Sequence, residues 1–228
     1  MQISDDLIRR FIRMAAEDKA PRFLRFLRNI TGPEANPIKR TQFFVIQAIA
    51  ENVDAQLLFN GDEGIHERGT LIAANDLELN PRGRLAYHVE LIGLISRCTE
   101  GLVPGPEAIG RSLISIGELL RHLVSPNLPL ALRSNYLAFL DEAYLYAKRP
   151  LEKSTELTAL VNVFARSVET YVEETVPHLD ADFQSNADDV ALCDYVLQRL
   201  MKTMRLLCVS CNALETCCVA VINIACSH

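Results

Sequence analysis

Along most of the chain, hydrophobic residues recur every three or four positions rather than at every second position. This spacing is typical of helices that bury one face, and no alternating stretch is long enough to predict a strand. Ser4 can cap a first helix, and we expect Leu7, Phe11 and Met14 to form its buried face. Pro21 predicts the start of a second helix, because proline has no N–H to lose in a first turn.

The same periodicity predicts further helices beyond the turn-forming residues 32–37. A third helix is expected from about Pro37 through Ile49, and another over 84–100, where Gly101 can adopt the left-handed conformation that ends helices. Ser115 and Glu118 have capping-box spacing at the start of the next one. The remaining predicted helices begin at Pro129 and Ser154, and a long helical tract is expected over roughly 187–226.

Residues 61–83 interrupt this pattern. The stretch is polar and contains four glycines and a proline, all of which weaken or end helices. We therefore predict a loop or insertion around a short helical segment.

These elements predict an all-α fold. The apolar helices that begin near Leu85 and Leu132 lie 47 residues apart, close to the repeat length of roughly 40–47 residues in armadillo and HEAT proteins. Because each helix pair must bury its exposed face against the next, we expect an armadillo/HEAT-like solenoid of paired antiparallel helices, with 1–228 forming a single domain. A plain helical bundle is the alternative.

Composition narrows the classes of function. The chain has 228 residues, is 49% hydrophobic and 23% charged, and carries a net charge of −6, which argues against general nucleic-acid binding. No signal peptide is evident, and polar residues break the most hydrophobic stretch, 206–225, so it falls short of a membrane span. Six of the seven cysteines follow residue 192, which favours reduced thiols over a disulfide scaffold.

Positive charge is concentrated near the N-terminus. Arg22, Arg25 and Arg28 are three residues apart, so they lie within an arc of about 120° on one helix. This row is either the solvated face of a buried helix or a patch that binds phosphate or an acidic partner. We interpret the three arginines as a candidate interface for an acidic protein segment, such as a neighbouring part of the solenoid.

Two segments, 85–101 and 125–146, resemble the cytosolic RIH region shared by inositol trisphosphate receptors and ryanodine receptors. In that family a Tyr-His pair opens a helix that ends in Cys-Thr-Glu-Gly, and a later helix introduced by proline ends near Tyr-x-x-Phe-Leu. The similarity covers roughly residues 5–148, within which 22–30 and 59–62 resemble the family's preceding helices. The matching positions are Tyr87, His88, Cys98, Thr99, Glu100, Gly101, Pro129, Tyr136, Phe139 and Leu140.

The resemblance implies a fragment of a very large tetrameric calcium-release channel, on the cytosolic face of an intracellular store membrane such as the endoplasmic reticulum. Its partners would be other domains and subunits of the same channel and regulatory proteins, with no contact to nucleic acid or membrane. The family's inositol phosphate site lies upstream and its basic motif has no match here, so no ligand contacts carry over. A free-standing armadillo-like adaptor is the alternative.

Two stretches contain residue types that can bind metal ions. The acidic stretch 180–189 lacks the glycine and the final glutamate of an EF-hand loop, so it is interpreted as a loop before a helix. The cysteines of 208–226 lack a turn that would bring a second ligand pair round a zinc ion, so core packing is favoured over zinc or a redox pair.

No enzymatic constellation is evident, and we expect no cofactor and no catalytic residues. The histidines are scattered: His88 is predicted to be a hydrogen-bonded core residue, whereas His122 lies near a helix C-terminus, where it suits the helix dipole.

Overall fold

The computed structural model describes residues 4–32, 38–101, 104–125 and 127–146, together with Arg199, Lys202, Thr203 and Leu206. The chain divides into two compact units, Met1–Ala147 and Lys148–His228. In the second unit the Thr203 hydroxyl donates to the carbonyl of Arg199, one helical turn earlier, at 3.0 Å. All the elements below belong to the first unit, which contains the segments that carry the family resemblance.

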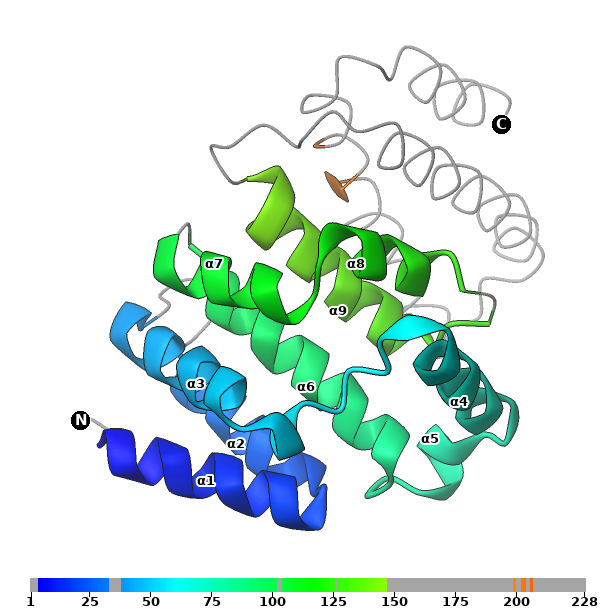
Figure 1. The fold of residues 1–228 in the computed structure, drawn as a ribbon, viewed down its shortest axis with the longest axis horizontal. Coiled ribbons are helices and arrows are strands. Elements are labelled where there is room, and N and C mark those ends of the chain that lie inside the picture. Colours follow the sequence, from blue (N-terminus) through cyan, green and yellow to red (C-terminus); the bar gives the residue numbers. More distant parts are fainter. Residues whose placement is uncertain are drawn as a thin grey trace, which may run out of the picture. The chain divides into compact units, whose positions relative to one another are not determined.

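The first unit is built from helices, and the described residues contain no strand, so the predicted all-α class is confirmed (Figure 1). None of these helices is long and apolar enough to cross a membrane. The α-helices are α1 (Asp5–Asp18), α2 (Pro21–Ile30), α3 (Lys39–Glu51), α4 (Gly61–Ala73), α5 (Asp76–Leu79), α6 (Arg84–Thr99), α7 (Pro104–Leu113), α8 (Ile116–Leu123) and α9 (Leu130–Leu140), with a 3₁₀ turn η1 (Val53–Ala55) and a π-helical turn η2 (Asp141–Leu145).

Several helix ends lie where the local sequence predicts them. The Ser4 side chain accepts the backbone N–H of Leu7, and Pro21 occupies the first turn of α2. Ser115 caps α8 through the N–H of Glu118, and Gly101, just after α6, has a φ of 89°. These signals depend on neighbouring residues only, which is why they can be read from the sequence.

The predicted buried face of α1 is wrong by one position. Ile8, Ile12 and Ala15 are buried, whereas Leu7 is 38% exposed and Phe11 is half-buried. Both sets recur at helical spacing, so periodicity alone cannot separate them. The Phe11 ring instead stacks on Phe26 of α2, with ring centroids 4.4 Å apart.

The predicted loop over 61–83 is also wrong, because α4 and α5 occupy most of it. The prediction treats glycine there as a helix breaker, but Gly64 is a packing residue. A Cβ atom at Gly64 would lie 2.5 Å from the carbonyl carbon of Phe59. Gly110 has the same role in α7, a helix that the sequence did not predict, since a Cβ there would lie 2.8 Å from Thr99 and 3.0 Å from Phe139. Glycine at these positions permits close backbone approach.

Gly64→Ala is expected to destabilise the protein by about 1–3 kcal/mol, because the added methyl meets backbone rather than a movable side chain. Gly69→Ala in the same helix is the matched control, since nothing lies within 4 Å of its added Cβ. That change should stabilise by about 1 kcal/mol through helix propensity. Urea unfolding of both variants measures the contrast, and two stabilised variants would show that α4 does not pack on Phe59.

The core of the unit is organised around α6. Twelve of its sixteen residues are buried, and α2 and α9 pack against it as its main neighbours. As predicted, Leu132, Tyr136, Phe139 and Leu140 of α9 point inward, each no more than 1% exposed. Helices α2, α6 and α9 therefore follow one another in space, while α3 packs against α7 and α1 packs against both α2 and α3 (Figure 1).

Candidate functional site

The predicted basic row lies on α2, but two of its three arginines are occupied within the fold. Arg25 donates from Nε and Nη2 to Oε1 of Glu90 on α6, at 2.9 and 2.8 Å. Arg28 Nη1 lies 3.8 Å from Oε2 of the same carboxylate. The guanidinium of Arg22 instead lies over the ring of Phe23, 4.8 Å from its centroid. Arg25 and Arg28 thus join α2 to α6, and Arg22 remains the member of the row most open to a partner.

Arg25→Glu is expected to lower the free energy of unfolding by about 1 kcal/mol, because it removes an ion pair and places a second carboxylate near Glu90. The effect stays small since the Arg25 side chain is 61% exposed. Arg22→Glu is the matched control: Arg22 makes no ion pair within the described residues, and the change should be below about 0.5 kcal/mol. Unfolding of the domain by Arg25→Glu, seen by circular dichroism, would make that arginine structural.

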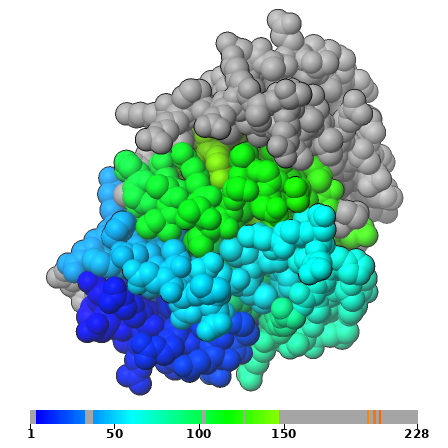
Figure 2. Space-filling model, viewed as in Figure 1, coloured from blue at the N-terminus to red at the C-terminus, as the bar shows by residue number. Residues whose placement is uncertain are grey.

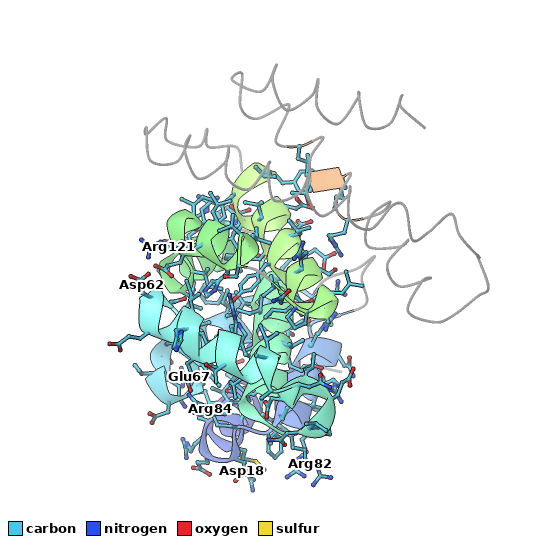
Figure 3. The ribbon with its side chains drawn as sticks, turned by 90° about the vertical axis from the view of Figure 1, so that its right-hand side faces the viewer. Asp18, Asp62, Glu67, Arg82, Arg84 and Arg121 are labelled. Carbon is cyan, nitrogen blue, oxygen red and sulfur yellow. The ribbon has the colours of Figure 1, made fainter. Side chains whose placement is uncertain are left out.

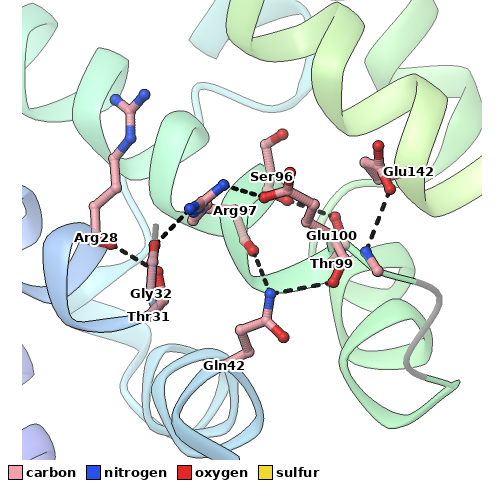
Figure 4. A network of polar contacts seen from close by, with 10 residues as sticks. Arg28, Thr31, Gly32, Gln42, Ser96, Arg97, Thr99, Glu100 and Glu142 are labelled. Atoms are coloured by element: carbon pink, nitrogen blue, oxygen red, sulfur yellow. Dashed lines mark hydrogen bonds and ion pairs between the residues drawn. The ribbon is translucent and has the colours of Figure 1, made fainter. Parts of the chain in front are cut away.

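A second polar cluster ties the end of α6 to its neighbours (Figure 4). The side-chain amide of Gln42 on α3 donates to the carbonyls of Arg97 and Glu100, at 2.9 and 3.1 Å. Arg97 donates to the carbonyl of Gly32 after α2 and pairs with Glu100. These contacts satisfy carbonyl groups that a helix C-terminus leaves without intrahelical partners.

The same cluster explains the residues that follow Cys98 in the sequence. The hydroxyl of Thr99 donates to the carbonyl of Ser96 at 2.8 Å, and the N–H of Gly101 donates to Glu142 of η2 at 3.4 Å (Figure 4). The Thr-Glu-Gly sequence therefore terminates α6 and connects it to η2.

The most unusual polar group in the unit is Arg68 of α4, which is only 1% exposed. Its Nη1 donates to Nδ1 of His122 and lies 3.4 Å from the Tyr136 hydroxyl, and its Nη2 donates to Ser125 Oγ at 2.8 Å. No carboxylate contacts Arg68 in the part of the chain that the structure describes, and its Nε has no hydrogen-bond partner there. Arginine is rarely buried without a counter-ion.

The direction of the hydrogen bonds around Arg68 is fixed by the groups at their ends. His88 Nδ1 lies 2.8 Å from the Leu57 carbonyl, which can only accept, so this nitrogen carries the proton. His88 Nε2 then accepts from the Tyr136 hydroxyl at 2.9 Å. His122 accepts from Arg68 at Nδ1, and its protonated Nε2 faces Asn60 Oδ1 at 3.4 Å. Both imidazoles must be neutral for the network to hold.

The electrostatics agree with this arrangement. The pKa of His88 is lowered to about 3, mainly by burial. The hydrogen bond to the Leu57 carbonyl raises this pKa in part, and the nearby charge of Arg68 lowers it. Burial, and then the charge of Arg68, lowers the pKa of His122 to about 2. The prediction for His88 is confirmed. The one for His122 needs correction, because a buried neutral imidazole brings no charge to the helix dipole.

Two ion pairs at the surface join α4 to neighbouring helices (Figure 3). Glu67 of α4 pairs with Arg84 of α6, and Asp62 of α4 lies 3.7 Å from Arg121 of α8. Together with the internal bonds of Arg68, they attach α4 to α6, α8 and α9. The arrangement holds separate segments in one geometry.

Sequence reasoning missed Arg68, although a signal is present. Arg68 shares helical spacing with Ile65 and Ile72, so it occupies a position of the apolar stripe of α4. The prediction of a loop over this region concealed that stripe.

Of the remaining candidate reactive or metal-binding residues, Cys98 lies within the described residues and two stretches lie outside them. Cys98 is a free, buried thiol whose pKa is raised by burial. In the described ranges, no three His, Cys, Asp or Glu side chains converge to hold a metal ion. The acidic stretch 180–189 and the cysteines of 193–226 lie outside the described residues. No model of a known protein family matches this chain.

Proposed function

We propose that this chain is a regulatory α-solenoid segment of a ligand-gated intracellular calcium-release channel of the inositol trisphosphate receptor and ryanodine receptor type. Its work is to transmit the state of a ligand site elsewhere in the channel toward a distant pore. On this proposal it lies on the cytosolic side of the store membrane and contacts other domains and subunits of the same channel.

One observation carries the proposal: the two segments that carry the family resemblance meet in the fold. His88 of the Tyr-His pair accepts a hydrogen bond from Tyr136 of the Tyr-x-x-Phe-Leu sequence, at 2.9 Å. Tyr87 donates to the carbonyl of Ala55 at 2.9 Å, so its hydroxyl also has a defined partner. The residues that carry the resemblance therefore have structural reasons to occur together, at the interface between α6 and α9.

The packing order supports the solenoid in this proposal. Helices α2, α6 and α9 pack in succession, and α3 packs beside α7. In a solenoid each repeat contacts mainly its neighbours. Such a stack transmits force when its helix layers shift as units, and the polar links at α6 and Arg68 keep adjacent layers together.

The full-length transcript tests the proposal. We expect it to continue, downstream of these 228 residues, into a pore domain with several membrane-spanning helices. An antibody against the α1–α9 region should detect a polypeptide far longer than this chain in the store-membrane fraction. A short transcript that encodes a protein without membrane spans would overturn the channel proposal and favour the armadillo-like adaptor.

A further inference from the structure

An exposed apolar surface lies where α1 and α2 meet. The stacked rings of Phe11 and Phe26 join the two helices, and the Phe26 side chain is 39% exposed. Leu7, one turn before Phe11, is 38% exposed. Met14, one turn after Phe11, is half-buried. We call these four residues the α1–α2 face.

Arginines border this face on both helices. Arg10 lies beside Phe11 on α1, and Arg22 lies one turn before Phe26 on α2. Both side chains are exposed, and neither makes an ion pair within the described residues. By contrast, Glu51 pairs with Arg9 and Glu90 pairs with Arg25. Arg10 and Arg22, which lie beside the apolar face, therefore have no carboxylate partner among the described residues.

The face is on the side of α2 that is turned away from α6. Arg25 marks the flank that contacts Glu90 of α6, and Phe26 lies about 100° farther round the helix. Because α2, α6 and α9 pack in succession, the Phe26 flank is where the next layer of a stack would pack. Figures 1 and 2 show α1, in dark blue, at the edge of the unit.

From this position we propose that the α1–α2 face binds an amphipathic helix with an apolar seam and acidic flanks, supplied by a neighbouring segment of the parent polypeptide. The inference rests on the proposed function. The outermost layer of a solenoid needs a polar outer surface unless another repeat covers it, and this one presents two phenylalanines. Unpaired arginines on both sides select acidic flanks, and aromatic residues with arginine are enriched at protein interfaces.

A pair of designed helical peptides tests the inference. Both share a leucine seam; one has glutamate at the flanking positions and the other has lysine. Fluorescence anisotropy with the full chain should show at least about tenfold tighter binding of the glutamate peptide. Arg10→Glu with Arg22→Glu should reverse that preference, and Phe26→Ser should weaken binding of the glutamate peptide about tenfold. Leu79→Ser and Arg82→Glu are matched controls, because both residues are exposed and neither belongs to α1 or α2.

Equal binding of the two peptides, or binding that Phe26→Ser leaves unchanged, would overturn the inference. So would self-association of the chain that Phe26→Ser abolishes, since the occupant would then be a second copy. If Phe26→Ser does not fold, the double variant Arg10→Glu, Arg22→Glu still decides the outcome. A short transcript together with selective peptide binding would defeat the proposed function alone, whereas a channel transcript without selective binding would defeat this inference alone.

Discussion

Phe139→Ala is expected to lower the free energy of unfolding by about 3–5 kcal/mol, the range for removing a fully buried aromatic ring. Phe139 of α9 has no exposed surface. Its ring meets the Tyr144 ring edge-on, with centroids 6.0 Å apart, and it lies against Gly110 of α7. The loss should be near the upper end, because a cavity at this site borders two other helices and relaxes only in part.

Chemical denaturation followed by circular dichroism measures this loss. Phe43→Ala is the control, since Phe43 of α3 is 36% exposed and its removal leaves no closed cavity. That variant should lose about 1 kcal/mol. A loss below about 1 kcal/mol for Phe139→Ala would place the ring at the surface and would contradict the packing of α9 on α6.

Acidification from pH 7.5 to 5.0 is expected to remove about 4 kcal/mol of stability through His88 and His122 alone. The pKa of His88 is lowered to about 3 and that of His122 to about 2 in the folded protein, against an ordinary value of about 6.5 for an unfolded chain. The unfolded chain therefore binds protons that the folded one excludes. The stabilisation is fully present above about pH 6.5 and is lost as the pH falls toward the folded pKa values.

Urea unfolding at a series of pH values checks this prediction. The slope of stability against pH below pH 6 should correspond to about two protons from these histidines, in addition to the carboxylates. His88→Gln should reduce the slope by about one proton. His66→Gln is the matched control, because His66 lies exposed on α4 and should leave the slope unchanged. An unchanged slope in His88→Gln would mean that His88 titrates normally in the folded protein.

Local signals were sufficient for much of the fold. Hydrophobic spacing predicted an all-α chain, Ser4 and Ser115 marked helix starts, and Gly101 marked the end of α6. The burial of α6 and α9 against each other was also predictable, because both helices are apolar over most of their length. Caps and apolar stripes act over one or two turns, so neighbouring residues contain all the information they need.

Other features depend on residues distant in the sequence. Which face of α1 is buried depends on α2, because the Phe11 ring stacks on the Phe26 ring of that helix. The packing role of Gly110 in α7 likewise depends on Phe139 of α9, which lies 29 residues later in the chain. In each case several arrangements were consistent with the local pattern, and the tertiary contact selected one.

The candidate site shows most clearly which features the local sequence predicts and which depend on tertiary contacts. The sequence alone determined that Arg22, Arg25 and Arg28 share one side of a helix, but only the tertiary structure placed Glu90, 65 residues after Arg25, within reach of two of them. Likewise, the bond between His88 and Tyr136 spans 48 residues, and that between Arg68 and Tyr136 spans 68. Charge and hydrogen-bond partners are chosen by proximity in space, so their pairing becomes definite only when the hydrophobic core has brought α2, α4, α6 and α9 together.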